Sequence, residues 1–496
     1  MNVLLLSMPD YFEHMPPVAV RMPNGALTSL AGNVDSHHRV AVADLILCYR
    51  RVRETITDLA RNLDPEVVGL SVMTFQRRTA QRIVALMRQL KPNVKIVVGG
   101  YDPSLARDAY EGMAVDYIVR GEGELTFREL LRALERGGDL TGIPGLSYAE
   151  GRGWVHNPDR PVHRLEDGEI RLPNRKARVL QGYTALGRQV DVVETSRGCT
   201  YDCSFCSIIE MRGRNFHTYS FERVLADIRD AAAHGARTIF LVDDNITLNV
   251  RRFEALCLAI IEAGLNTLDY FVQAMTSVIA NHGKTLAPLM RRAGFRYVFL
   301  GIENIIENDL RFLKAGAKNT LRDTTGILGQ NATLRAIECL HQNRMYVIGG
   351  LIVGNPGDTL QSIEANLDFT RRYVDWPYIQ HPTPYPRTPM TDELRKRGLI
   401  VSERLEEYDG TTAVVRTEHV SVEEIEYVRW KAERWMKLRH MPVAFRHDPW
   451  FVVRHASQML AHTFRGSTVR SVLRIENERK AFERYKEIRR QEREYL

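Results

Sequence analysis

Short apolar runs alternate with helical patterns through the first part of the chain. The runs are bounded by polar or glycine-containing turns, so they read as buried strands and the segments between them as helices. This alternation predicts an α/β fold, with a doubly wound, Rossmann-like domain over residues 1–136 and a ligand site at the carboxyl ends of its parallel strands. The expected strands are 3–7, 40–47, 67–74, 94–100 and 115–120, and the expected helices are 23–34, 56–63, 78–90 and 126–136.

A second alternating series begins near residue 186. It contains about six strand–helix units, which predict a partial (β/α)6 barrel over residues 186–390 with its active face at the carboxyl ends of the strands. The expected strands are 191–195, 238–243, 269–274, 297–301, 346–353 and 378–380.

The remaining segments are a linker and a tail. Residues 137–185 are punctuated by prolines and predict a linker with one small hairpin at 146–157. Residues 391–496 predict a helical C-terminal region. The polar segment 318–331 either covers the barrel mouth or forms a surface insert.

Composition and charge narrow the class of protein. The 496 residues are 44% hydrophobic and 26% charged, as in ordinary globular proteins. The N-terminal apolar run lacks the basic region of a signal peptide, and we find no stretch apolar enough to span a bilayer. Cysteine is rare, so we expect a reducing, cytoplasmic location. The net charge of +7 is concentrated after residue 430.

Three closely spaced cysteines carry the strongest chemical signal. Cys199, Cys203 and Cys206 have the spacing C-x3-C-x2-C, and Phe205 precedes the last one. Three thiolates on one loop can hold three corners of a [4Fe–4S] cluster and leave the fourth iron open to a small molecule. The alternative is a structural zinc site with His217 as fourth ligand, although such sites usually pair two cysteines with a second, distant pair.

The cysteine motif, placed after a barrel strand, resembles the signature of radical SAM enzymes. Three later motifs resemble the same family: 240–245 near the methionyl group of SAM, 301–304 near its ribose and 350–359 near its adenine. Asp243 and Asp244 are neighbours, so only one can point into the barrel. The glycines could equally serve turns or packing. Through this resemblance we expect the three cysteines to bind the cluster and the following residues to contact SAM: Phe205, Asp243, Asp244, Gln273, Glu303, Gly350 and Gly354.

The N-terminal domain resembles the cobalamin-binding domain that precedes many radical SAM barrels. The matching loops are 69–74, 97–100 and 120–124, and the motif at 381–389 also resembles cobalamin-linked members. A plain nucleotide site is the alternative. The resemblance implies these cobalamin contacts: Asp10, Ser71, Met73, Thr74, Gly99, Gly100, Gly121 and Glu122.

One part of the cobalamin pattern is missing. The D-x-H-x-x-G motif that supplies a histidine to cobalt is absent, because Asp10 and His14 are too far apart in sequence. His37 and His38 precede the second strand, which is the wrong place. The resemblance therefore implies cobalt without a histidine ligand.

The resemblance implies reductive cleavage of SAM and methyl transfer from cobalamin to an unactivated carbon of an apolar substrate. The same cofactors serve an oxidative cyclase or a rearranging enzyme of the tetrapyrrole type, and a non-enzymatic cobalamin sensor is a third hypothesis. The expected partners are a small molecule, such as a lipid or tetrapyrrole, and an electron donor such as flavodoxin or ferredoxin. Hopanoid methylases and the anaerobic Mg-protoporphyrin ester cyclase are similar members of the family.

The tail mixes aromatic and basic residues. The tail contains Trp450, Phe451 and Phe464 together with Arg454, Arg465 and Arg470, which suits either peripheral contact with an anionic membrane or a cap on the barrel. Nucleic-acid binding is less favoured, because acidic residues interleave with the basic ones from Glu476 onward.

Overall fold

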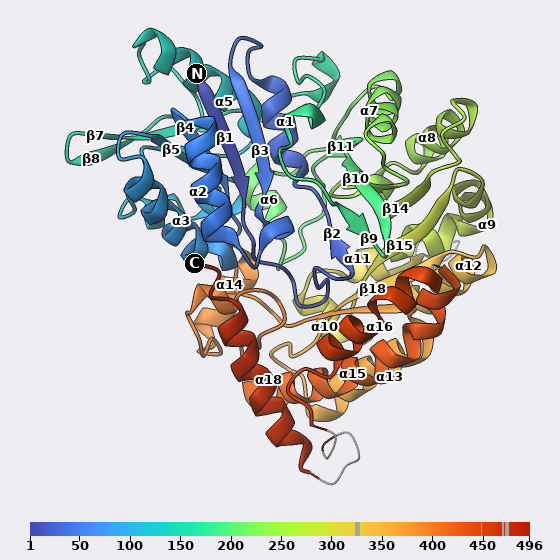
Figure 1. Ribbon diagram of the computed structural model, residues 1–496. Coiled ribbons are helices and arrows are strands. Elements are labelled where there is room, and N and C mark those ends of the chain that lie inside the picture. Colours follow the sequence, from blue (N-terminus) through green and yellow to red (C-terminus); the bar gives the residue numbers. More distant parts are fainter. Residues whose placement is uncertain (323–327, 448, 469–470, 472–475) are drawn as a thin grey trace.

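Two large sheets lie side by side, each with helices packed against it (Figure 1). The computed structural model describes residues 1–322, 328–447, 449–468, 471 and 476–496. The first sheet has the strand order β3-β1-β4-β5-β6-β7-β8, and the second has the order β19-β18-β15-β14-β13-β10-β9-β2.

The first sheet is parallel over five strands. They are β1 (Asn2–Ser7), β3 (Arg39–Asp44), β4 (Val67–Ser71), β5 (Lys95–Gly99) and β6 (Tyr117–Val119). The hairpin of β7 (Leu146–Glu150) and β8 (Gly153–His156) extends this sheet antiparallel to β6, so part of the predicted linker belongs to it.

Helices cover both faces of this sheet, as the alternation of β1 requires. Leu4 and Leu6 face α2 (Val52–Leu63) and α3 (Arg77–Leu90), whereas Val3 and Leu5 face α1 (Gly25–Asn33) and α5 (Gly123–Arg136). The doubly wound fold is confirmed.

The second sheet contains six parallel strands and forms the predicted partial barrel. Its strands are β10 (Arg188–Val193), β13 (Thr238–Leu241), β14 (Asp269–Met275), β15 (Phe295–Glu303), β18 (Tyr346–Ile352) and β19 (Trp376–Gln380). The helices between them are α7 (Phe221–Ala233), α8 (Val250–Glu262), α9 (Thr276–Arg292), α12 (Thr333–Gln342) and α13 (Leu360–Tyr373).

A strand from the N-terminal part of the chain joins the barrel sheet. β2 (Val20–Arg21) pairs with β9 (Thr184–Ala185), which in turn pairs with β10. The segment between β1 and α1 therefore crosses to the barrel, and the sequence pattern did not predict this crossing.

The C-terminal region is helical, as expected, and packs on both domains. Its helices are α14 (Pro389–Lys396), α15 (Val422–His447), α16 (Pro449–Thr463) and α18 (Glu478–Glu492). Ile425 and Met436 of α15 pack on α13 and β19. The end of the chain returns to the first domain, where Tyr495 and Leu496 join its core (Figure 1).

The connection between β15 and α12 contains further elements. They are α10 (Glu307–Phe312), α11 (Gly316–Asn319), β16 (Thr320–Arg322) and β17 (Leu328–Asn331). Residues 323–327 of the predicted cover or insert lie outside the described residues.

Candidate active site

The three motif cysteines share one loop at the carboxyl end of β10. Cys199 and Cys203 are buried, Cys206 is partly exposed, and none of them forms a disulfide. Burial raises the pKa of the Cys206 thiol to about 12. A thiolate at this position therefore needs a positive partner, and a metal ion supplies one.

Two adjacent aspartates hold this loop in place. Asp243 accepts the backbone N–H of Thr195 at 2.7 Å, and Asp244 accepts that of Gly198 at 2.7 Å. Gly198 has a φ of +91°, and a Cβ there would collide with Asn215, so the turn requires glycine. Both aspartates therefore bind the cysteine loop. Contact of either aspartate with SAM stays a prediction.

The geometry does not favour the zinc alternative. The Nδ1 atom of His217 lies 3.6 Å from a carboxylate oxygen of Glu166. Among the described residues, no close group of three potential metal ligands includes any of the three cysteines. A tetrahedral zinc site needs its ligand atoms close together, whereas a cluster spreads three sulfur ligands over three irons.

Glu303 ends β15 in a strained conformation. Its φ is +58°, in the left-handed region that side chains other than glycine rarely adopt, and the pairing register with β18 shifts here. The carboxylate folds back over Gly301, where an added Cβ would lie 2.7 Å from it. Burial raises the pKa of Glu303, and Lys318 partly offsets that effect. Such strain is common where an acid is held for a ligand.

Lys318 is a site residue that the motifs did not reveal. Burial alone would lower the pKa of its ammonium, but Glu303 and the three motif cysteines together outweigh burial and raise it. The ammonium also lies 5.4 Å from the centre of the Tyr201 ring. The only signal in the sequence was the polar segment that begins at this lysine, and α11 places it over the cysteine loop.

Two predicted glycines differ in their surroundings. A Cβ on Gly350 would lie 2.6 Å from the Phe299 ring, so this glycine lets the ring pack against β18. Gly354 has a φ of +90°, and its Cβ would meet Ile425 of α15 at 3.0 Å, so turn and packing require it. Phe205 packs among apolar side chains that include Phe75 and Leu313.

Asn245 connects the second barrel strand to the cysteine loop. Its amide Nδ2 donates to the sulfur of Cys199 at 3.6 Å and to that of Met275 at 3.1 Å. Hydrogen bonds to cysteine sulfur raise the reduction potential of a cluster, so this amide can tune one.

The carboxyl edge of the first sheet forms a narrow cavity of about 100 Å³. Gly99 and Gly121 line it, together with Ser71 and the apolar side chains Leu27 and Phe127. A Cβ on Gly99 would approach the carbonyl of Val119 to 3.2 Å. The glycines leave space because they carry no side chain, and the remaining wall is apolar. Both features suit a flat, buried nucleotide base, so the cavity fits the tail of cobalamin.

Two family models match the chain. The model of the B12 binding domain matches residues 15–131, and that of the Radical SAM superfamily matches residues 193–370. The chain belongs to the radical SAM enzymes that carry a B12-binding domain. Their cofactors are a [4Fe–4S] cluster, SAM and cobalamin, so the resemblance inferred from the motifs is confirmed.

Relatives of this radical SAM enzyme match most of its length. An uncharacterized methyltransferase of Pyrococcus horikoshii is 28% identical over 438 residues, which are 87% of this chain and 91% of that protein. The anaerobic magnesium-protoporphyrin IX monomethyl ester cyclase of Rubrivivax gelatinosus is 26% identical over 437 residues, covering 84% and 74%. The radical S-adenosylmethionine methyltransferase TsrM of Kitasatospora setae shares the fold, with a TM-score of 0.64 and 22% identity over 80% of this chain and 76% of that one.

Ion pairs join the two domains of the radical SAM enzyme beside its cysteine loop. Arg197 donates to Glu124 of α5 at 2.6 Å and to Glu194 at 2.7 Å. Glu122 lies 3.5 Å from Arg197 and 3.8 Å from Arg212. The loop with Glu122 and Glu124, which resembled a cobalamin loop, therefore also binds the barrel.

The residues expected to contact cobalamin do not all line the narrow cavity. Ser71, Gly99, Gly100 and Gly121 line the narrow cavity, whereas Asp10, Met73, Thr74 and Glu122 do not. Asp10 accepts a hydrogen bond from Thr79 at 2.8 Å and lines a separate cavity rich in arginine. Cobalamin contact by these residues stays a prediction.

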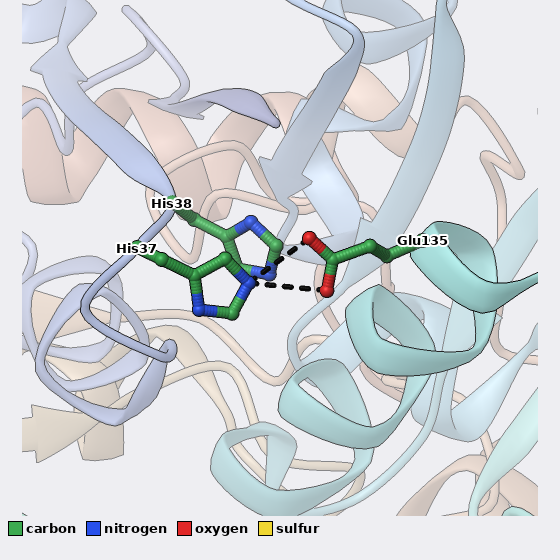
Figure 2. Close-up of side chains that lie close together, drawn as sticks. All are labelled: His37, His38 and Glu135. Carbon is green, nitrogen blue, oxygen red and sulfur yellow. Dashed lines mark hydrogen bonds and ion pairs between the residues drawn. The ribbon is translucent and has the colours of Figure 1, made fainter.

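The histidines near β1 and β3 are not among the described residues that line the narrow cavity. Figure 2 shows His37 and His38 facing Glu135 of α5, with 3.0 Å between His37 Nε2 and the carboxylate. Both histidines precede β3, so they lie at the amino ends of the strands, whereas the cavity lies at the carboxyl ends. The length of β3 separates these two ends by about 20 Å. His14 is buried 3.4 Å from Glu433 of α15. Cobalt without a histidine ligand stays a prediction.

The helical tail covers the barrel and exposes part of its apolar surface. Phe451 and Val452 are buried against Leu186, whereas Trp450 is 80% exposed and Val453 is 61% exposed. Within the described part of the chain, no helix is long and apolar enough to cross a membrane.

Proposed function

We propose that this enzyme transfers a methyl group from cobalamin to a carbon atom of a small molecule, in a reaction that begins with reductive cleavage of SAM. One observation carries the proposal: the glycine-lined edge of the B12-binding sheet abuts the cysteine loop through Arg197 and Glu124. The two cofactor sites therefore face one another, so a substrate between them is within reach of both.

We assign the cluster to the three cysteines. Cys199, Cys203 and Cys206 would each bind one iron, and the open iron supplies one-electron chemistry to SAM when the cluster is bound. Lys318 lies beside Cys203 and Glu303. An ammonium there would bind the SAM carboxylate, and the Glu303 carboxylate would accept hydrogen bonds from ribose hydroxyls.

We assign the cobalamin tail to the narrow cavity of the first sheet. Ser71, Gly99, Gly100 and Gly121 would surround the base, and Leu27 and Phe127 would exclude water from it. Bound cobalamin supplies the transferable methyl group. An external one-electron donor, such as flavodoxin or ferredoxin, would reduce the cluster in the cytoplasm.

Oxidative cyclisation is the second candidate. The similarity to a cyclase over 84% of this chain favours it. The two reactions differ in their products, because methyl transfer converts a second SAM into S-adenosylhomocysteine and cyclisation does not.

The proposal is tested by following the methyl group. The reconstituted holoenzyme is incubated anaerobically with methyl-deuterated SAM, a reductant and a small-molecule extract of its source cells. Mass spectrometry should then find a product carrying the labelled methyl group, together with 5′-deoxyadenosine and S-adenosylhomocysteine. Formation of 5′-deoxyadenosine with an unlabelled, oxidised product would support cyclisation and contradict methyl transfer.

A further inference from the structure

Four aromatic side chains form a continuous row across the inside of the barrel. Phe240, Phe271, Tyr297 and Tyr346 are direct partners in the parallel register of β13, β14, β15 and β18. Their ring centres are 4.3, 6.5 and 5.6 Å apart along the row. The neighbouring strand residues Tyr270 and Val272 pack instead into the core between sheet and helices. The row therefore faces the barrel interior, as the strand period of two requires.

A second level of side chains lies closer to the cysteine loop. Gln273, Phe299 and Ile348 are two residues further along these strands and also face the interior. The next level contains Met275, Gly301 and Gly350. The Glu303 carboxylate covers Gly301 and the Phe299 ring covers Gly350, because an added Cβ would lie 2.7 Å and 2.6 Å from them. Glu303 therefore lies one level beyond Phe299 along β15.

These residues surround a cavity of about 340 Å³. Met15, Met22 and Leu186 close it on the side where β2 and β9 extend the sheet. Among the described residues that line the cavity, none is a lysine or arginine and Asp375 is the one carboxylate. Asp375 already binds His341 at 2.7 Å and accepts the backbone N–H of Val347 at 2.8 Å.

We infer that this lumen binds the body of the substrate, and that the substrate is an uncharged molecule with a flat, apolar ring system. The inference rests on the proposed function, because it assigns the lumen to the methyl acceptor. Aromatic walls favour flat rings in offset or edge-on contact. An anion in a cavity without a cation would lose its hydration and gain no partner. The volume is that of a site for a small organic ligand.

Two neutral amides provide the polar contacts of this site. Gln273, whose contact with SAM stays a prediction, lines the cavity together with Gln380. The Gln380 amide lies against the backbone of Gly410. Each amide can donate to a carbonyl or accept from a hydroxyl of the substrate. Such groups would orient the ring system while leaving its net charge at zero.

SAM itself is a poor occupant of the lumen. Its amino, carboxylate and sulfonium groups need charged partners or a metal, whereas the Lys318 ammonium, proposed for the carboxylate, lies beside the cysteine loop. The uncharged lumen is thus left to a second molecule, adjacent to the SAM site.

The test compares two probes of the same shape. Equilibrium dialysis of the cluster- and cobalamin-loaded enzyme measures binding of pyrene, which is uncharged, and of pyrenesulfonate, which is anionic. Pyrene should bind at least tenfold more tightly. Ile348→Trp, which fills the lumen, should weaken pyrene binding at least tenfold, while Leu258→Trp on the exposed face of α8 should not. The visible absorbance of the cluster checks that both variants are folded.

A second variant tests the charge argument without filling the cavity. Gln273→Lys places a cation in the lumen and should increase pyrenesulfonate binding several-fold. Equal binding of the two probes to the wild type, or unchanged pyrene binding by Ile348→Trp, would overturn the inference. The proposed function fails by a different result: a wild-type enzyme that binds pyrene but releases no 5′-deoxyadenosine from SAM.

Discussion

The guanidinium of Arg197 donates to Oε1 of Glu124 across the two domains, at 2.6 Å. Arg197 stands two residues before the first motif cysteine, and Glu124 lies in the first turn of α5, directly after a loop of the narrow cavity. Both side chains are buried. The pair therefore couples the position of the cysteine loop to that of the B12-binding sheet.

Removing Arg197 should destabilise the protein strongly. In Arg197→Ala the buried carboxylate of Glu124 loses its cationic partner and keeps the hydrogen bond from Ser29, and breaking a buried ion pair costs about 3–5 kcal/mol. Chemical denaturation should measure this loss as a lower free energy of unfolding. The control is Arg214→Ala, whose exposed pair with Asp202 should contribute less than about 1 kcal/mol. Equal effects of the two substitutions would contradict the structural role of Arg197.

Lys318 should govern the affinity for SAM. Replacing it with methionine removes one charged hydrogen bond, worth about 1.5–3 kcal/mol, so the KM for SAM should rise roughly tenfold or more. Lys318→Arg should recover part of the loss. The matched control is Lys284→Met on the exposed surface of α9. An unchanged KM in Lys318→Met, measured by release of 5′-deoxyadenosine, would exclude this role.

The narrow cavity should be required for cobalamin but not for the cluster. Ser71→Phe fills the cavity with a ring, so the purified protein should bind less than about a tenth of the wild-type cobalamin, since overpacking commonly costs 1–3 kcal/mol. Iron content should stay the same. Ser36→Phe, at an exposed position, serves as the control. Absorbance spectra and iron analysis measure both quantities, and full cobalamin binding by Ser71→Phe would place the tail elsewhere.

Asp10 predicts a pH dependence of stability. Burial raises its pKa from 3.8 to about 7, although the hydrogen bond from Thr79 opposes this. The folded carboxyl keeps its proton up to about pH 7, while the unfolded one releases it near pH 4, so its contribution to stability falls as pH rises between these values. The slope is at most about 1.4 kcal/mol per pH unit.

Denaturation of the wild type and of Asp10→Asn at several pH values measures that slope. The wild type should lose stability relative to the variant between pH 4 and pH 7, and the difference should be constant above pH 8. A difference that does not change with pH would mean that Asp10 is already ionised in the folded protein at low pH.

The sequence predicted both domains because their signals are local. Alternating apolar runs such as 67–74 specify strands, and the spacing of Cys199, Cys203 and Cys206 is legible without a structure. The predicted strand 67–74 ends earlier, at Ser71, because the chain turns there into a short 3₁₀ helix (Thr74–Gln76). The hairpin at 146–157 was also predicted, but not that it extends the first sheet.

Contacts between distant segments could not be predicted in this way. Lys318 reaches the cysteine loop from α11, and no periodic pattern marks it. β2, which crosses to the barrel, has only two residues. A strand of this length is too short to give an alternating pattern in the sequence. Asp243 and Asp244 were ambiguous because adjacent side chains point apart, and only the folded loop shows that both bind it. Such roles depend on tertiary structure rather than on local propensity.

A cluster held by the three-cysteine loop should cleave SAM. The most direct measurement is the yield of 5′-deoxyadenosine from anaerobically reconstituted enzyme with SAM and a strong reductant. The wild type and Cys48→Ala, whose cysteine is distant in sequence and outside the motif, should both release it. Cys203→Ala should release none above background. Full release by Cys203→Ala would contradict the account.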